Sequence, residues 1–178
     1  MLSDEAGETA TATTQAYVQG AGVVDGTLYV IGSQLRDTIV VTQSGNEVEV
    51  RTKLNRQRTS TSIVERSSLD AIMIETQSSS DTILVRHDGG ITTEINAGSG
   101  NNTIRVPNGS ADLNTLGGRD KIYLGDGDHV VDSGFGNDRI YTGNGDNHVT
   151  SLGGNNRIYL GIGDDTIVTG AGSDWIMT

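Results

Sequence analysis

Residues 124–150 read LGDGDHVVDSGFGNDRIYTGNGDNHVT and divide into three nine-residue lines, LGDGDHVVD, SGFGNDRIY and TGNGDNHVT. Each line has a glycine at its fourth position and an aliphatic residue at its eighth. Glycine adopts turn conformations that other residues avoid, whereas branched aliphatic residues favour strands. The fixed interval therefore predicts a chain that alternates short turns with short strands.

The same interval extends in both directions along the chain. A glycine recurs every nine residues from Gly100 to Gly172, and an aliphatic residue follows four positions later each time, from Ile104 to Ile176. Two columns without a miss indicate a repeat architecture rather than chance. The glycines that we predict to occupy turns include Gly100, Gly118, Gly127, Gly136, Gly145, Gly154, Gly163 and Gly172.

Residues 97–178 resemble the repeats-in-toxin family, whose nonapeptide is G-G-x-G-x-D-x-U-x. The resemblance implies that two nonapeptides form one coil of a parallel β-roll and that calcium lies between stacked turns, held by Asp carboxylates and turn carbonyls. We therefore predict an all-β protein, a parallel β-roll or β-solenoid with an irregular β-rich N-terminal portion. One line of nine inward aliphatic residues should form its core.

The position of the family's Asp, two residues after the glycine, is only partly acidic in this sequence. Because one coil takes two repeats, alternate members stack on the same side, at the spacing of about 4.8 Å between strands. One side reads Asn102, Asp120, Asp138, Asn156 and Asp174, and the other reads Ala111, His129, Asn147 and Asp165.

Calcium takes six to eight oxygen ligands with some negative charge. The resemblance implies calcium ligands at Asn102, Asp120, Asp138, Asn156, Asp165 and Asp174. Asp120 stacked over Asp138 offers two carboxylates and is the strongest candidate. On the other side Ala111 and His129 break the pattern, with Asp128, Asp146 and Asp164 one residue earlier as partial substitutes. The alternative is that ladders of Asn amides have replaced the metal.

The residues that flank each inward aliphatic must point outward, because side chains alternate along a strand. The flanks form a basic column and an aromatic column, which we predict to be a partner face: Lys121, Arg139 and Arg157, then Tyr123, Tyr141 and Tyr159, with Trp175 in the last repeat. Stacked cations are unfavourable unless something negative lies against them. Candidate partners are a neighbouring copy, an acidic polysaccharide or the acidic N-terminal arm, and the alternative is a solvated ladder.

The N-terminal half lacks the regular glycines but is rich in strand signals. We expect an arm at 1–24, irregular β coils that begin or cap the solenoid at 25–96, and the β-roll at 97–178. The expected strands lie in 27–32, 37–52 with a hairpin turn at 43–46, 61–65, 70–76, 81–90 and 91–96. Asp37-Thr38-Ile39 and Asp81-Thr82-Ile83 echo the repeat without its glycines.

Composition excludes several classes of protein. The 178 residues carry a net charge of −11, which disfavours nucleic acid, and 34% hydrophobic residues with one Phe and one Trp, which indicates a thin, repetitive core. There is no cysteine and no stretch long enough for a membrane span. The N-terminus lacks the features of a secretory signal, so we expect a processed form or a route that reads no such signal. No catalytic motif is present, and we expect a protein that is not an enzyme.

The end of the chain suggests a role. GAGSDWIMT, residues 170–178, completes a repeat without the polar cap that solenoids ordinarily need. We therefore expect an extracellular or cell-surface structural subunit that is stabilised by calcium and self-assembles head to tail into a filament or surface layer. The alternative is a calcium-binding repeat module, for carbohydrate binding or for secretion and folding, detached from a larger secreted protein, with the blunt end set by trimming.

Overall fold

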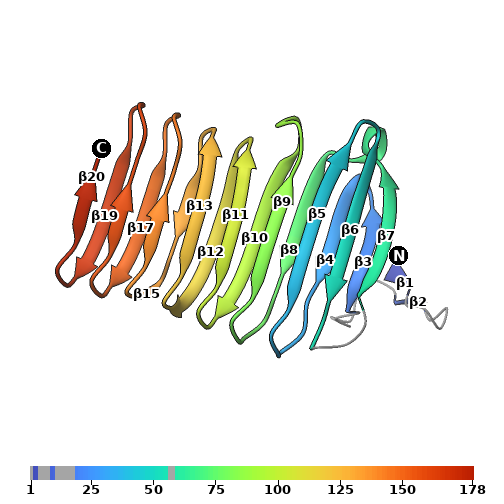
Figure 1. Cartoon of the computed structure of the whole chain (residues 1–178), viewed down its shortest axis with the longest axis horizontal. Helices are drawn as coiled ribbons and strands as arrows, with labels where there is room; N and C mark the ends of the chain where they lie inside the picture. The colour runs from blue at the N-terminus through green and yellow to red at the C-terminus, as the bar shows by residue number, and fades with distance from the viewer. Residues whose placement is uncertain (1, 4–8, 11–18, 56–58) are drawn as a thin grey trace.

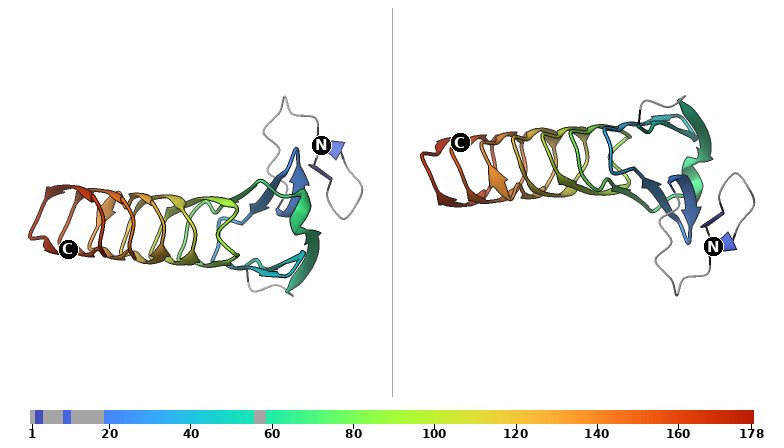
Figure 2. Two further views of the ribbon diagram at one scale, coloured as in Figure 1. Left: turned by 90° about the horizontal axis from the view of Figure 1, so that it is seen from above. Right: turned by 90° about the horizontal axis from the view of Figure 1, so that it is seen from below.

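A computed structural model describes residues 2–3, 9–10, 19–55 and 59–178. Two sheets face each other across a thin core, and the chain winds from one sheet to the other along the stack (Figures 1 and 2). Most of the expected arm at 1–24 lies outside the described residues. Within it, β1 (Leu2–Ser3) pairs antiparallel with β2 (Thr9–Ala10).

The two sheets take alternate strands of the chain. Sheet 1 contains β3 (Gly20–Val24), β4 (Thr27–Ile31), β8 (Ala71–Glu75), β10 (Thr92–Ser99), β12 (Ala111–Gly118), β14 (Val130–Asp132), β15 (Phe135–Gly136), β17 (His148–Gly153) and β19 (Thr166–Ala171). Sheet 2 contains β5 (Thr38–Ser44), β6 (Glu47–Lys53), β7 (Ser60–Glu65), β9 (Thr82–Arg86), β11 (Thr103–Asn108), β13 (Lys121–Asp126), β16 (Arg139–Tyr141), β18 (Arg157–Tyr159) and β20 (Trp175–Met177). The predicted β-solenoid is confirmed, and its coils are parallel.

Stacked aliphatic columns form the core, one on each sheet. On sheet 2 the pairing register aligns seven isoleucines, namely Ile39, Ile83, Ile104, Ile122, Ile140, Ile158 and Ile176. On sheet 1 Leu113, Val131, Val149 and Ile167 align in the same way. Burying one apolar column per sheet gives each short strand its place in the stack, because a one-residue slip would turn the column toward solvent.

The predicted core line is wrong at its C-terminal end. Ile158 is fully buried, but Ile167 is only half-buried and Ile176 is 43% exposed, because no further coil covers them. The nine aliphatic residues also form two columns rather than one, since successive repeats lie on opposite sheets.

Coil length changes along the chain. Register partners are 18 residues apart from Ile104 onward, which is two nonapeptides, but 21 residues separate Ile83 from Ile104. The first coil takes 44 residues, from Ile39 to Ile83, because it contains β6, β7 and the one-turn 3-10 helix η1 (Arg66–Ser68). Parallel coils thus begin well before residue 97.

Antiparallel strands flank the first coil at the N-terminal end. β3 pairs antiparallel with β4, and β6 lies between β5 and β7 (Figure 2). The β5–β6 hairpin turns at Gly45, where φ is +60°, so the hairpin expected at 43–46 is confirmed. The strands expected in the other N-terminal segments are also present.

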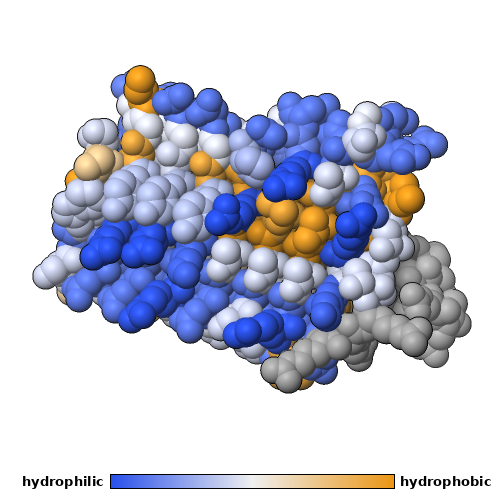
Figure 3. All heavy atoms as spheres, viewed as in Figure 1, coloured by the Kyte–Doolittle hydropathy of each residue, from blue (hydrophilic) through white to orange (hydrophobic). Residues whose placement is uncertain are grey.

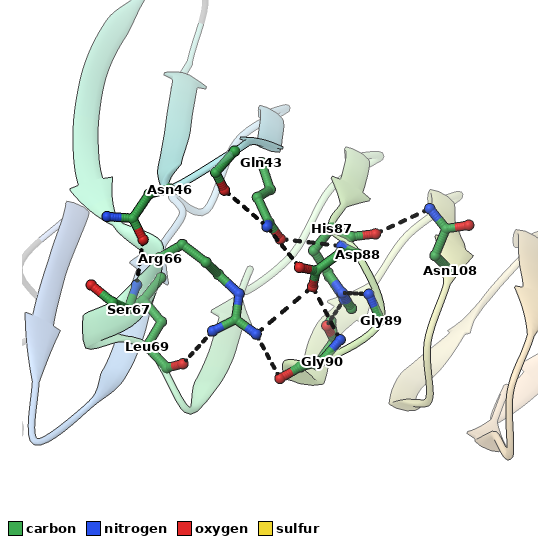
Figure 4. Close-up of polar contacts among 12 residues, drawn as sticks. Gln43, Asn46, Arg66, Ser67, Leu69, His87, Asp88, Gly89, Gly90 and Asn108 are labelled. Carbon is green, nitrogen blue, oxygen red and sulfur yellow. Dashed lines mark hydrogen bonds and ion pairs between the residues drawn. The ribbon is translucent and has the colours of Figure 1, made fainter.

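A polar network joins this N-terminal end to the coils (Figure 4). Arg66 Nη1 donates to the carbonyl of Leu69 at 2.9 Å and Arg66 Nη2 to that of Gly90 at 2.8 Å. Gln43 Nε2 donates to Asp88 Oδ2 at 2.9 Å, and this bond, with a backbone N–H from Gly90, lowers the pKa of Asp88. The network fixes the loop between β9 and β10 against η1. No helix among the described residues is long and apolar enough to cross a membrane.

Candidate metal centre

The turns that lead into sheet 2 carry a buried column of Asp and Asn side chains, which we call the inner column. It contains Asp37, Asp81, Asn102, Asp120, Asp138, Asn156 and Asp174. In each step the backbone N–H of one member donates to Oδ1 of the member in the next coil. The donor–acceptor distances are 2.7 to 2.9 Å. The side chains therefore tie adjacent coils together where the chain turns.

Glycine is required beside this column. At Gly136 φ is +152°, and a Cβ atom there would lie 1.6 Å from the carbonyl oxygen of Gly118. At Gly118 φ is +131°, and a Cβ atom would lie 1.9 Å from the carbonyl oxygen of Gly100. The turn backbones thus stack too closely for any side chain, which brings their carbonyl groups near the inner column. The remaining predicted turn glycines also have positive φ.

Asp120 and Asp138 differ from the rest of the repeat region in having unsatisfied carboxylates. Asp120 is 0% and Asp138 2% exposed, and Oδ2 of each is buried without a hydrogen-bond partner. Burial raises the pKa of Asp120 to about 6, with a smaller contribution from the nearby Asp138 carboxylate. Burial also raises the pKa of Asp138. Two desolvated carboxylates in adjacent coils are costly unless a cation compensates them.

Hydroxyl groups border the same space and were missed by the sequence analysis. Thr115, Ser133 and Ser151 lie five residues before Asp120, Asp138 and Asn156, and all three are buried. Thr115 Oγ1 donates to the carbonyl of Ser133 at 3.0 Å, and Ser133 Oγ has no partner. A hydroxyl at this position in alternate repeats was the available signal.

These residues fit a calcium ion at the Asp120–Asp138 step. The orphaned Oδ2 atoms would supply two charged ligands, and Ser133 Oγ and turn carbonyls are the nearby neutral oxygens. Within the described ranges no three Asp, Glu or His side chains form a group that could hold a metal ion. Backbone oxygens would therefore have to complete the coordination, and bound calcium would supply the positive charge that the buried pair lacks.

The Asn members of the column satisfy their own hydrogen bonds. Asn156 donates from both its backbone N–H and its Nδ2 to Asp174 Oδ1, each at 2.9 Å, and Nδ2 also donates to Ser151 Oγ. Asn102 Nδ2 lies 3.4 Å from the carbonyls of Ala97 and Gly100. At these steps an amide provides the donors that a metal would otherwise replace. The two alternatives of the sequence analysis thus coexist in one column.

The opposite turns, which lead into sheet 1, are arranged differently. Of the predicted metal ligands only Asp165 lies there, and its Oδ1 accepts the backbone N–H and Nδ2 of Asn147 at 3.0 and 2.9 Å. His129 is 1% exposed and occupies its turn, with Nδ1 accepting the N–H of Ala111 and Nε2 bonded to the carbonyl of Gly125 at 2.9 Å. Burial lowers the pKa of His129, although Gly125, Asp128 and Asp126 oppose this. A neutral imidazole therefore fills this turn.

The predicted partner face lies on sheet 2. The rings of Tyr123, Tyr141 and Tyr159 stack at centroid distances of 5.1 and 4.4 Å, nearly parallel. Arg105 lies over Tyr123 at 4.4 Å, and Trp175 meets Tyr159 edge to face at 4.8 Å. The faces of the Tyr rings are thus covered by one another, so only edges and hydroxyl groups point outward.

Comparison with known proteins agrees with this geometry. Residues 108–140 and 141–176 match the RTX calcium-binding nonapeptide repeat, in four copies, and repeats of this kind bind calcium. No curated protein and no solved structure matches the chain.

Proposed function

We propose that this chain, whose residues 108–176 are RTX calcium-binding nonapeptide repeats, is an extracellular, non-catalytic structural subunit that calcium stabilises and that assembles head to tail. The observation that carries the proposal is the contrast between inner and terminal coils. Ile140 and Ile158 are 0% exposed, whereas Ile176, in the same column, is 43% exposed. An aliphatic column left open at one end favours a further β coil against it.

Surface composition supports an association at this end. Hydrophobic residues reach the surface at the C-terminal end of the molecule in Figure 3. Trp175, Ile176 and Met177 of β20 are each between 43% and 51% exposed, and Val168 of β19 is 52% exposed. β19 and β20 are also the terminal strands of their sheets, and β3 and β7 are the terminal strands at the other end. Each sheet of one copy can thus continue into a sheet of the next by strand addition.

Calcium and location are linked by the chemistry of the inner column. The Asp120–Asp138 step has only two carboxylates, which suits the weak binding of extracellular modules, with a Kd on the order of 10⁻⁴ to 10⁻³ M. Such a site fills where calcium is abundant, so we place the protein outside the cell. The ion would stabilise the fold because it binds the native turns and not the unfolded chain.

Calorimetric titration tests the calcium part of the proposal. The double variant Asp120→Asn/Asp138→Asn keeps Oδ1 acceptors for the neighbouring N–H groups but removes both charges. We expect calcium to release or absorb heat with the wild type and much less with this variant. Asp165→Asn, on the opposite turns, is the matched control and should titrate as the wild type does. Equal heats from wild type and double variant would contradict the assignment.

Sedimentation equilibrium in calcium tests the assembly. We expect the wild type to associate as its concentration rises and Ile176→Lys, which places a charge on the open end, to stay monomeric. Phe135→Lys is the control, because Phe135 is 62% exposed but lies in a turn away from this end. A wild type that remains monomeric would overturn head-to-tail assembly.

The second candidate is a calcium-binding repeat module of a larger secreted protein. The same open edge of β19 and β20 favours it, since further coils of a longer chain would cover Ile176 equally well. Calcium binding together with a monomeric wild type would support this module over the structural subunit.

A further inference from the structure

The opposite edges of the solenoid carry opposite charges. On the turns that lead into sheet 2, and at the start of the strands that follow them, lie Arg119, Lys121, Arg139 and Arg157, which we call the basic edge. These four cations line an open groove of about 650 Å³ together with Tyr159 and Trp175. Lys121, Arg139 and Arg157 are register partners in three consecutive coils.

The turns that lead into sheet 1 carry the acidic edge, which we define as Asp126, Asp128, Asp146 and Asp164. All four are exposed. The backbone N–H of Asp146 donates to Asp128 Oδ1 at 2.9 Å, and that of Asp164 donates to Asp146 Oδ1 at 2.8 Å. These bonds hold the carboxylates of three consecutive coils at one position in each coil.

Neither edge is neutralised within the described part of the chain. The ion pairs among residues 19–55 and 59–178 join Arg51 to Glu49 and Arg66 to Asp88, at the N-terminal end. Like charges stacked at the strand spacing are unfavourable without a counter-charge. Each edge therefore gains from a partner of the opposite sign.

We propose that copies of this chain associate side by side, with the basic edge of one copy against the acidic edge of the next. Both edges repeat once per coil, so three cations and three carboxylates meet in register when two solenoids lie parallel. The contact is heterologous and does not close on itself, so it continues as a row. It uses a different surface from the open C-terminal coil and does not require head-to-tail assembly.

A second copy fits the groove better than an acidic polysaccharide does. Sugar rings pack on exposed aromatic faces, but the faces of Tyr123, Tyr141 and Tyr159 cover one another. A copy instead brings carboxylates with the same axial spacing as the cations, because the same fold sets both. Exposed ion pairs contribute little individually, so the contact depends on several pairs and weakens as salt screens them.

Charge-neutralised variants test the proposal. Lys121→Gln/Arg139→Gln/Arg157→Gln removes the basic edge, and Asp128→Asn/Asp146→Asn/Asp164→Asn removes the acidic edge while keeping the Oδ1 acceptors. All proteins carry Ile176→Lys, so that end-to-end contacts do not contribute, and calcium is held constant. The measurement is the mass distribution in sedimentation velocity at low and high ionic strength, after circular dichroism has shown that each variant is folded.

At low ionic strength we expect the protein with both edges intact to form oligomers of increasing size that dissociate at high ionic strength. Each neutralised variant alone should be monomeric, and an equimolar mixture of the two should stop at the dimer, because only one complementary pair of edges remains. Arg86→Gln and Asp112→Asn, outside the two edges, should associate as the parent does. Association of the neutralised variants to the parent's extent, or no association of the parent, would overturn the proposal. Binding of an oligogalacturonate to the basic edge of a parent that stays monomeric would assign the groove to an acidic polysaccharide instead.

Discussion

The backbone N–H of Asp120 donates to Oδ1 of Asp138 at 2.9 Å, while Oδ2 of both side chains is buried without a partner. One carboxylate oxygen thus joins adjacent coils, and the other is left for a further ligand. Without a cation the pair costs stability, because two charges are desolvated next to each other. This step makes the stability of the solenoid depend on both pH and calcium.

The pH dependence follows from the raised pKa of Asp120. Burial raises this pKa from 3.8 to about 6, so the folded chain holds the proton over a range in which the unfolded chain has lost it. Stability therefore falls as pH rises from 3.8 to 6, by on the order of 3 kcal/mol. In calcium-free urea unfolding, Asp120→Asn should remove most of this fall, because the amide keeps the Oδ1 acceptor without the charge.

Calcium should act in the opposite direction above pH 6, because it favours the ionised carboxylates. We expect it to stabilise the wild type more than Asp120→Asn. Asp112→Asn, on the exposed face of β12, is the control and should keep the pH profile of the wild type. A calcium-free wild type that gains stability across this window relative to Asp120→Asn would refute the assignment of the buried charge.

A new calcium site is expected when the opposite turns regain carboxylates. His129→Asp/Asn147→Asp removes the imidazole that fills its turn and aligns three acidic residues, since Asp165 already follows in the next coil. The variant should be less stable than the wild type without calcium and should bind additional calcium in calorimetric titration. His129→Asn/Asn147→Asn has similar shape without charge, and additional binding by it would argue against this reading.

Replacement of a turn glycine should disrupt the stack. In Gly136→Ala the new Cβ atom would lie 1.6 Å from the carbonyl oxygen of Gly118, so the backbones of two coils must separate. We expect a loss of about 3 kcal/mol or more in the free energy of unfolding. Gly45→Ala is the matched control, because φ there is also positive but no atom lies within 4 Å. Its cost should be about 1–2 kcal/mol, and equal losses would show that backbone conformation alone sets the requirement.

The sequence predicted the C-terminal coils well because their period is uniform. From Ile104 onward each coil takes 18 residues, so counting places every turn and strand. The count failed before residue 97, where coils of 21 and 44 residues join Ile104 to Ile83 and Ile83 to Ile39. The antiparallel pairing of β3, β6 and β7 depends on contacts between distant segments, which no local pattern specifies.

The inner column was predicted in part. Spacing placed Asp120 over Asp138, but it could not show that the Asn156 amide satisfies the neighbouring Asp174 or that His129 bonds to Gly125. The column also extends to Asp37 and Asp81, whose Asp-Thr-Ile triplets were visible in the sequence but fall outside the nine-residue period. Hydrogen bonds between coils, rather than residue types, decide which members retain an unsatisfied charge.

The Tyr column should contribute to stability whether or not a partner binds beside it. Tyr141 lies between two rings, 5.1 Å from Tyr123 and 4.4 Å from Tyr159, so its removal breaks two stacked contacts. Aromatic pairs contribute about 0.5–1.5 kcal/mol each beyond area burial, so Tyr141→Ala should lower the free energy of unfolding by about 2–3 kcal/mol. Tyr141→Phe keeps the rings stacked and should lose less than about 1 kcal/mol. Urea unfolding measures both values, and near-ultraviolet circular dichroism should show a weaker Tyr signal for Tyr141→Ala alone. Equal losses from the two variants would assign the contribution to the hydroxyl group rather than to stacking.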